Sequence, residues 1–360
     1  MELAQRHGFP LAGVLNLDQA RGAISNDIAR YDTWLGAGMH GEMAYLQRGR
    51  DRRTDPALVF DGAKGMLCVA TPYGPRDGDE IASPATQADY AKYLRGRDYH
   101  VAMKERLEAL LSEAATRFDF SWKVCCDTSA VLERSWAALA GLGWIGKNTC
   151  LIHPRLGSYL FLAEALLSEN PGGAPRPMRD HCGKCDRCLK ACPTDAFPEP
   201  GALDARRCIS YWTLEKRGPL TLGDDDGAAL GNRVAGCDIC QEVCPFNRKP
   251  RPPIWDEWRD AAADATALRD WETLLNESEE DYRERVRRSA LSWVKPHQFR
   301  RNLALSLASV AGELGQEVVQ RLLGLVIRRE DAESDPDALA AWTYCRARME
   351  QALRSRVPHS

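Results

Sequence analysis

Two cysteine-rich stretches carry the residues with the clearest chemistry in this 360-residue chain. The first contains Cys182, Cys185, Cys188 and Cys192, and Pro193 follows the last of them. This spacing is the bacterial ferredoxin run, in which three thiolates hold one 4Fe–4S cluster and the fourth crosses to a second cluster. The spacing therefore predicts a pair of 4Fe–4S clusters.

The second stretch supplies most of the remaining ligands, because Cys237, Cys240 and Cys244 lie there at a similar spacing. Counting assigns four thiolates to each cluster. We expect cluster one on Cys182, Cys185, Cys188 and Cys244, and cluster two on Cys192, Cys208, Cys237 and Cys240. Paired Cys-x2-Cys units also bind zinc. Three cysteines at i, i+3 and i+6 followed by Cys-Pro are, however, expected of a cubane cluster rather than of tetrahedral zinc.

The overall composition indicates a globular chain, since 44% of the residues are hydrophobic and 28% are charged. Its length predicts two or three domains. The net charge is only −3, so no global field would recruit nucleic acid or a membrane. Residues 1–16 lack the apolar core of a signal peptide, and no stretch approaches the ~20 apolar residues of a membrane span. We therefore expect a reducing, cytoplasmic location and no membrane contact.

Three regions of different character divide the chain. Residues 1–170 alternate short apolar stretches with a helical pattern at 103–118, which predicts an α+β domain. Residues 171–253 begin with a Gly/Pro linker and hold the predicted cluster ligands, so we expect a ferredoxin-like domain. Residues 254–360 predict an α-helical, HEAT-like cap. The expected strands are 11–17, 66–70, 120–126 and 158–162, and the expected C-terminal helices are 286–311, 315–329 and 335–354.

Iron–sulfur clusters transfer electrons but do no bond chemistry on an organic substrate, so another residue must do it. Asp127 directly follows the strand predicted at 120–126, where active-site carboxylates commonly lie in α/β proteins. Burial there would raise its pKa and allow it to deliver a proton near neutral pH. The alternative is that Asp127 only caps the next helix. The residues alone leave both interpretations open.

Two other patterns match known motifs incompletely. Residues 141–146 have the Gly-x-Gly-x-x-Gly spacing of dinucleotide sites, but they follow a helical segment and no acidic residue lies about 20 positions on. We interpret these glycines as sites of close backbone approach. Residues 98–100 resemble the motif of His-ligated corrinoids, but Met103 occupies the position that requires Gly. We therefore do not expect His100 to bind cobalt.

A basic stretch lies late in the chain. Seven Lys or Arg residues occur between Arg283 and Arg301 against Glu284 alone, with Trp293 and His297 among them. Such a stretch could follow an RNA backbone, with the aromatic rings available for stacking on bases. The alternative is an ordinary solvated helix face.

Taken together, several segments resemble the epoxyqueuosine reductases. They are Gly38–Leu46, Gly96–His100, Asp127–Arg134, Gly141–Asn148 and the two cysteine runs. The resemblance extends over nearly the whole chain. It implies that the N-terminal domain binds cobalamin beside the two clusters, and that the protein reduces epoxyqueuosine to queuosine at the wobble position of tRNA. The implied partners are the tRNA anticodon arm and an unidentified electron donor, and we expect a monomer.

The resemblance also implies roles for single residues. Asp127 would be the proton donor, with Arg134 beside it. The positions implied to contact cobalamin are Arg53, Tyr93, Asp127, Leu151, Leu162, Ser210, Asp238 and Ile239. Electrons would pass from cluster one through cluster two to cobalamin, while Asp127 protonates the epoxide oxygen, which leaves as water.

Three other classes of protein share part of these features. A corrinoid-dependent reductive dehalogenase would share the corrinoid and the clusters, but such enzymes resemble exported proteins with twin-arginine signals. A ferredoxin-type electron-transfer module would hold no corrinoid, which absorbance beyond the iron–sulfur band would reveal. An RNA-binding protein with structural clusters would bind tRNA without forming a product.

Overall fold

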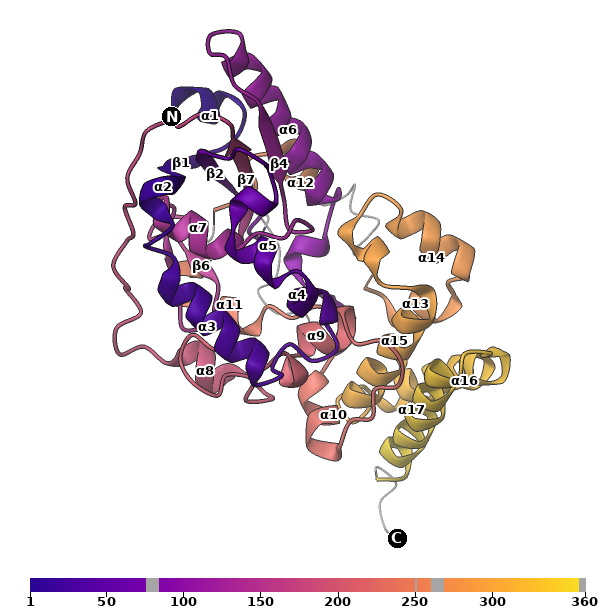
Figure 1. Ribbon diagram of the computed structural model, residues 1–360. Coiled ribbons are helices and arrows are strands. Elements are labelled where there is room, and N and C mark those ends of the chain that lie inside the picture. Colours follow the sequence, from indigo (N-terminus) through magenta and orange to yellow (C-terminus); the bar gives the residue numbers. More distant parts are fainter. Residues whose placement is uncertain (76–83, 250, 260–268, 356–360) are drawn as a thin grey trace.

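The computed structural model describes the chain except residues 76–83, 250, 260–268 and 356–360 (Figure 1). A four-stranded antiparallel sheet with strand order β1-β2-β7-β4 forms the centre of its N-terminal part. The strands are β1 (Leu11–Asn16), β2 (Gly65–Pro72), β4 (Trp122–Cys125) and β7 (Leu160–Leu167). Three strands lie where the sequence predicts them. The fourth continues five residues beyond the predicted end, because Glu164, which interrupts the apolar pattern, is itself buried in it.

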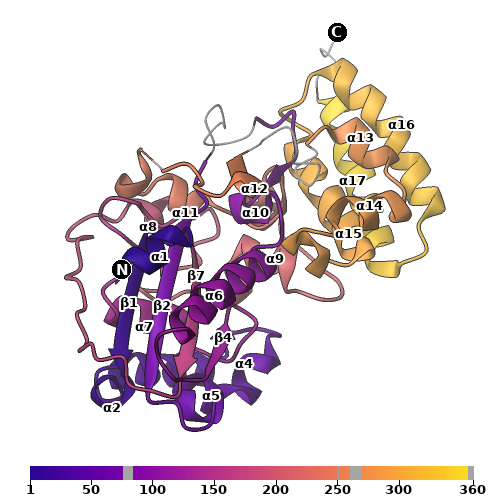
Figure 2. The same cartoon turned by 90° about the horizontal axis from the view of Figure 1, so that it is seen from above.

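Helices cover both faces of this sheet, as Figure 2 shows. Helix α6 (Tyr99–Ala115) packs through Leu107 and its neighbours on the face that includes Phe161. Helix α7 (Glu133–Leu139) packs through Trp136 on the opposite face. Because both faces are covered, successive residues of the central strands β2 and β7 are buried almost without interruption, rather than alternating between buried and exposed.

Short elements surround this sheet. Those before the cysteine stretches are α1 (Glu2–Arg6), α2 (Leu17–Ala20), α3 (Ser25–Gly36), α4 (Ala44–Arg48), α5 (Arg50–Thr54), η1 (Pro56–Leu58), β3 (Asp89–Tyr90), η2 (Lys92–Leu94), β5 (Trp144–Ile145) and β6 (Leu151–Ile152). Those of the cysteine region are α8 (Arg187–Ala191), η3 (Ala205–Arg207), α9 (Ile209–Leu214), α10 (Asp224–Leu230), β8 (Arg233–Ala235), α11 (Ile239–Glu242) and η4 (Pro245–Asn247). The parallel pair β3–β8 joins the two regions.

The C-terminal part is helical, as the sequence predicts. Its elements are α12 (Asp256–Arg259), α13 (Trp271–Asn276), α14 (Glu279–Val286), η6 (Ala290–Trp293), α15 (Pro296–Val310), α16 (Gln316–Ala332) and α17 (Pro336–Arg354). The single helix predicted over 286–311 is wrong. Pro296 cannot donate the hydrogen bond that a helix interior needs, but it fits the first position of α15. None of the helices that the structure describes is long and apolar enough to cross a membrane.

The ends of the predicted domains interlock. Trp255 lies beyond the boundary predicted at residue 253, yet its Nε1 donates to the carbonyl oxygen of Gly8 at 2.9 Å. Trp258 packs against Phe161 of the N-terminal sheet, with 5.3 Å between ring centroids. Trp255 and Trp258 thus belong to the core of the first region. The three domain ranges and the HEAT-like relationship of the C-terminal helices stay predictions.

Arg301 of α15 connects the C-terminal helices to the cysteine region. Its side chain is only 1% exposed. Its Nη1 donates to the carbonyl oxygens of Lys216 at 3.1 Å and Gly218 at 2.5 Å, and its Nη2 donates to that of Trp212 at 2.9 Å. Burial lowers the pKa of this guanidinium to about 10. Arg301 therefore holds α15 against residues 212–218 in the interior of the protein, and it cannot be part of an exposed RNA-binding face.

We expect Arg301→Met to destabilise the protein by about 3 kcal/mol, because three buried carbonyl oxygens would lose a charged donor. Urea unfolding of the variant measures this loss. Arg283→Met is the matched control, since Arg283 is exposed and makes a single surface ion pair with Glu279, and it should change stability by less than about 1 kcal/mol. Equal stability of the two variants would contradict the assignment.

Candidate functional site

The structure brings together the same two groups of cysteines that the spacing predicts. All thirteen cysteines are free thiols. Electrostatic interactions link Cys182, Cys185, Cys188 and Cys244 in one group and Cys192, Cys208, Cys237 and Cys240 in the other. Among the described residues, no three side chains of His, Cys, Asp or Glu converge closely enough to hold a single ion. The cysteines of each group are therefore near one another, and their assignment as cluster ligands stays a prediction.

The chemistry of these thiols fits iron–sulfur ligation. Burial, followed by the neighbouring Cys182 and Cys244, raises the pKa of Cys188 to about 11. Burial likewise raises the pKa of Cys237 to about 12. Crowded, desolvated thiols ionise only when a cation compensates the charge, as cluster iron does. Donors already face two sulfurs: Trp144 Nε1 lies 3.5 Å from the Cys182 Sγ, and the Ala196 N–H lies 3.3 Å from the Cys192 Sγ.

Cys150 is a residue whose position the sequence interpretation missed. Its spacing from the other cysteines gives no signal, because it belongs to neither cysteine run. In the structure its thiol is hydrogen-bonded to Cys240, and this contact lowers the pKa of Cys150. It therefore lies beside the second group of predicted ligands.

Asp127 lies in the turn that follows β4, and its backbone φ is +47°. This left-handed conformation is uncommon for a residue with a side chain and marks a strained position. The helix-cap alternative is wrong, because α7 begins six residues later and Leu132 is its N-cap residue. The expectation of a buried carboxyl is also wrong. The Asp127 side chain is 56% exposed, because it stands beyond the end of an edge strand of an antiparallel sheet.

His100 is the direct partner of Asp127. Its Nε2 hydrogen-bonds to the Asp127 Oδ2 at 2.9 Å, and its Nδ1 hydrogen-bonds to the Asp98 Oδ1 at 2.6 Å. Burial alone would lower its pKa, but the two carboxylates outweigh burial and raise the pKa of His100 to about 9. His100 therefore carries a proton at neutral pH. The sequence shows Asp98 and His100 as neighbours but gives no sign of the contact with Asp127.

A titration of His100 tests this arrangement. Its folded-state pKa lies above its ordinary value of 6.5. The bonds it makes should therefore stabilise the fold fully below pH 6.5, and this contribution should vanish as the pH rises through about 9. We expect an NMR midpoint for His100 near 9, and a stability advantage over His100→Gln of about 1–2 kcal/mol at pH 6 that disappears by about pH 10. A midpoint near 6.5 would contradict the contact.

Two carboxyl groups lie behind Asp127, that of the partly buried Glu133 and that of the buried Glu164. The backbone N–H of Asp127 donates to the Glu133 Oε1, and burial followed by the charge of Asp127 raises the pKa of Glu133 to about 8. Glu164 is fully buried on β7, neither of its oxygens has a hydrogen-bond partner among the described residues, and burial raises its pKa well above the ordinary value. Burial thus favours the neutral form of both carboxyls, and Glu133 holds the turn in which Asp127 lies.

Several positions implied to contact cobalamin lie around Asp127. Tyr93 is half-buried, and desolvation of its phenol, followed by the charges of Asp127 and Asp238, raises its pKa. Cys208 acts on the same phenol, so Tyr93 connects the neighbourhood of Asp127 to the second cysteine group. Asp238 precedes α11 and accepts a hydrogen bond from the backbone N–H of Lys92 at 2.7 Å.

The other implied positions come from separate elements. Ile239 begins α11, Ser210 lies in α9, Leu151 in β6 and Leu162 in β7. The Nη1 of Arg53, in α5, lies 3.5 Å from the Ser129 carbonyl oxygen, but its buried Nε–H has no partner in the described structure. This unpaired donor fits a ligand that carries hydrogen-bond acceptors, such as the amide side chains of a corrinoid.

Arg134 does not point at Asp127. Its Nη1 donates to the Thr149 carbonyl oxygen at 2.7 Å. Thr149 has a left-handed φ of +65° and lies two residues before Leu151. Arg134 therefore braces this loop, and its predicted role beside Asp127 would be indirect.

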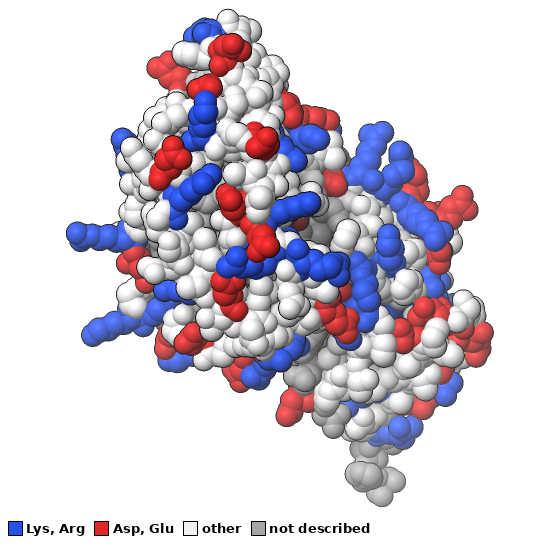
Figure 3. All heavy atoms as spheres, viewed as in Figure 1, with Lys and Arg blue, Asp and Glu red and all other residues white. Residues whose placement is uncertain are grey.

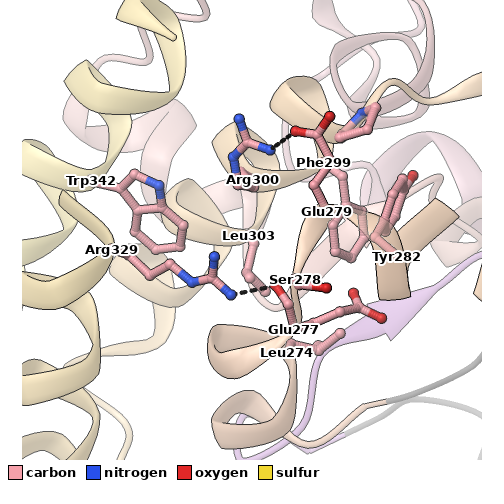
Figure 4. Close-up of a pocket in the computed structure, with 11 residues that line it drawn as sticks. Leu274, Glu277, Ser278, Glu279, Tyr282, Phe299, Arg300, Leu303, Arg329 and Trp342 are labelled. Atoms are coloured by element: carbon pink, nitrogen blue, oxygen red, sulfur yellow. Dashed lines mark hydrogen bonds and ion pairs between the residues drawn. The ribbon is translucent and has the colours of Figure 1, made fainter. Parts of the chain in front are cut away.

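The basic stretch at 283–301 is largely engaged in internal ion pairs. Arg300 pairs with Glu279 at 2.9 Å, as Figure 4 shows, and it also pairs with Glu333 at 2.7 Å. Arg285 pairs with Glu277 at 2.5 Å. The cavity beside these pairs measures about 20 Å³, which is room for about one water molecule. Figure 3 shows basic and acidic side chains intermixed on this face. Most of the stretch is thus structural, and RNA contact by its remainder stays a prediction.

Comparisons with known proteins agree with this arrangement. Residues 181–247 match a family model described as "4Fe-4S double cluster binding domain", and residues 53–128 match one described as "Epoxyqueuosine reductase QueG, DUF1730". The fold and the two cysteine groups therefore define an iron–sulfur oxidoreductase. An epoxyqueuosine reductase of Synechococcus sp. (strain CC9605) is 40% identical over 75% of this chain and 82% of its own length. That of Pseudomonas aeruginosa is 36% identical over 84% and 82%. The chain belongs to the epoxyqueuosine reductase family.

Solved structures extend the similarity to the whole fold. A crystal structure of epoxyqueuosine reductase with an epoxyqueuosine-modified tRNA-Tyr stem loop superposes with a TM-score of 0.79 at 25% identity, over 97% of each chain. The enzyme from Bacillus subtilis, with its catalytic loop swung out of the active site, gives a TM-score of 0.78 at 25% identity, over 96% of this chain and 98% of that one.

Proposed function

We propose that this protein reduces epoxyqueuosine to queuosine at the wobble position of tRNA, with Asp127 as the proton donor. The observation that carries the proposal is the position of Asp127 and the residues that hold it there. A strained turn holds it between the protonated His100 and the partly buried Glu133, and Tyr93 lies between this turn and the second cysteine group. Membership of the family favours this reaction over a reductive dehalogenation or a simple electron-transfer module.

Removal of the epoxide oxygen as water consumes two electrons and two protons. When bound, cobalamin and the two 4Fe–4S clusters would supply the electrons. Asp127 protonates the departing oxygen, because an unprotonated alkoxide in a site closed by substrate is costly. His100, which carries a proton at neutral pH, supplies it to Asp127 through their 2.9 Å hydrogen bond. After His100 regains a proton from solvent, the second proton follows the same route, so that the oxygen leaves as water. Asp98 holds the imidazole in the orientation that makes this transfer possible.

Other residues would bind and orient cobalamin. The polar contacts to cobalamin would come from Arg53, Tyr93, Ser210 and Asp238, and the apolar contacts from Leu151, Leu162 and Ile239. The substrate is the anticodon arm of a tRNA, in line with the stem loop bound to the relative described above. We expect a cytoplasmic monomer that receives its electrons from a separate donor.

Anaerobic reconstitution tests the proposal. The protein is loaded with iron, sulfide and cobalamin, reduced with dithionite, and mixed with an anticodon stem loop that carries epoxyqueuosine. Nucleoside analysis should then show queuosine. Protein loaded with iron and sulfide but no cobalamin is the matched control and should form none. Failure of the fully loaded protein to form queuosine would refute the proposed function.

A further inference from the structure

An open hollow of about 530 Å³ lies between α8 and α11. These helices contact each other and carry Cys188 and Cys240. In Figures 1 and 2 they lie side by side, away from the C-terminal helices α16 and α17. Its lining includes Asp186, Arg187, Lys190, Glu242, Val243 and Arg248. The hollow therefore opens over helices that supply one ligand to each predicted cluster.

Positive charge remains at this hollow after internal pairing. Lys190 neutralises Asp186, with 2.8 Å between their charged atoms. The buried Lys92 pairs with Glu242 at 2.8 Å. Arg187 and Arg248 are exposed, and their side chains make no hydrogen bond or ion pair with the residues that the structure describes. Two uncompensated guanidinium groups thus remain at its edge.

The neighbouring segments strengthen this charge. Residues 176–190 and 248–251 contain eight Lys or Arg against two Asp, in a chain whose net charge is −3. Arg179, Lys184 and Lys249 are exposed there. A local positive field of this kind accelerates the encounter with an acidic partner.

We propose that the hollow and its basic rim form the docking surface of an acidic one-electron carrier protein. The proposal rests on the proposed function, because a reductase needs repeated delivery of electrons. At each encounter the carrier is oxidised by one electron and a cluster is reduced by one. Two encounters supply the two electrons that one epoxide requires. Only α8 and α11 separate the hollow from the predicted cluster ligands, so a docked carrier would lie close to its acceptor.

RNA is the other anion that a basic surface could bind. The lining of the hollow mixes charged groups with the apolar Ala191 and Val243, which suits a protein interface. Within the described structure, no lining residue shares a hydrogen bond or ion pair with Asp127, His100 or Glu133. The observations therefore favour a protein partner over the RNA substrate.

The double variant Arg187→Glu/Arg248→Glu tests the docking surface. Its matched control is Arg117→Glu/Arg328→Glu, because these two arginines are also exposed and also lack a side-chain partner among the described residues. The probe is a reduced flavodoxin, an acidic one-electron carrier. Calorimetry measures its affinity, and stopped-flow absorbance measures the rate of cluster reduction. We expect both to fall at least about tenfold in the double variant and less than about twofold in the control.

The outcomes separate this proposal from the proposed reaction. Dithionite needs no docking, so dithionite-driven queuosine formation should be equal in both double variants. Cluster reduction by flavodoxin should be slow only in Arg187→Glu/Arg248→Glu. Equal flavodoxin affinity and equal reduction rates in both would overturn the docking surface. Weakened stem-loop binding with unchanged flavodoxin binding would assign the surface to RNA and also overturn it. Normal reduction by flavodoxin in the unsubstituted protein without queuosine would contradict the proposed function instead.

Discussion

Replacement of Asp127 by Asn is expected to lower kcat about 10²–10⁴-fold, the usual contribution of a positioned acid. Asn cannot supply the proton, but it tolerates the left-handed backbone that Asp127 adopts at φ +47°. The hydrogen bond from its backbone to Glu133 should also survive. The fold, iron content and cobalamin content should therefore stay unchanged, so that the loss reports on proton delivery alone.

The measurement is single-turnover formation of queuosine from an epoxyqueuosine stem loop by prereduced protein. Asp119→Asn is the matched control, because Asp119 is exposed just beyond α6, and it should react at the unsubstituted rate. A fully active Asp127→Asn protein would remove Asp127 from the mechanism. The companion variant His100→Gln should slow the single turnover as well, but less than Asp127→Asn does, because its proposed role is to supply a proton to Asp127.

Cys208→Ala is expected to lower the iron content from about eight to about four per chain and to abolish queuosine formation. Cys208 is the one predicted ligand outside both cysteine runs, and it caps the start of α9. Without it, cluster two would lack its fourth thiolate, and electrons could not pass from cluster one to cobalamin. Iron and sulfide analysis after anaerobic reconstitution measures the change.

Two further variants make this test specific. Cys345→Ala removes a buried thiol of the C-terminal core and should leave eight irons, apart from a modest loss of stability. Cys150→Ala removes the thiol that lies against Cys240. If Cys150→Ala lost a cluster while Cys208→Ala kept both, the predicted ligand set would be wrong, and Cys150 would be the fourth ligand of cluster two.

The cysteine groups could be predicted because their ligands follow one another at short, fixed spacings. Cys208 was found by counting, since it is the one further cysteine between the two runs. Cys150 was missed because its neighbour Cys240 lies 90 residues away and no local pattern connects them. Spacing therefore predicts a ligand set but not the groups that the fold adds around it.

The setting of Asp127 could be predicted only in part. Its place after a strand was visible, but its exposure and its left-handed backbone depend on the end of an edge strand in an antiparallel sheet. The contact with His100 joins the start of α6 to the turn after β4, across 27 residues. A residue that completes a site from another element leaves no periodic signal in the sequence.

The basic stretch shows a different limit. Seven positive residues within 19 positions left open both an RNA-binding face and an ordinary solvated helix face. In the fold, Arg301 points into carbonyl oxygens of residues 212–218, and Arg285 and Arg300 pair with glutamates. Charge counted along a sequence does not distinguish side chains that face solvent from those that join two packed elements.

We propose that two 4Fe–4S clusters, held by eight thiolates, deliver electrons to cobalamin beside Asp127, and that these electrons remove one oxygen atom from the substrate. Electron counting in a single turnover tests it most directly. Protein reconstituted with iron, sulfide and cobalamin is fully reduced, freed of reductant and mixed with an excess of epoxyqueuosine stem loop, and the queuosine formed is compared with the electrons lost from the absorbance bands. We expect two electrons to be lost for each queuosine formed and no product from cobalamin-free protein. Queuosine formed without cobalamin, or without any loss of electrons, would contradict it.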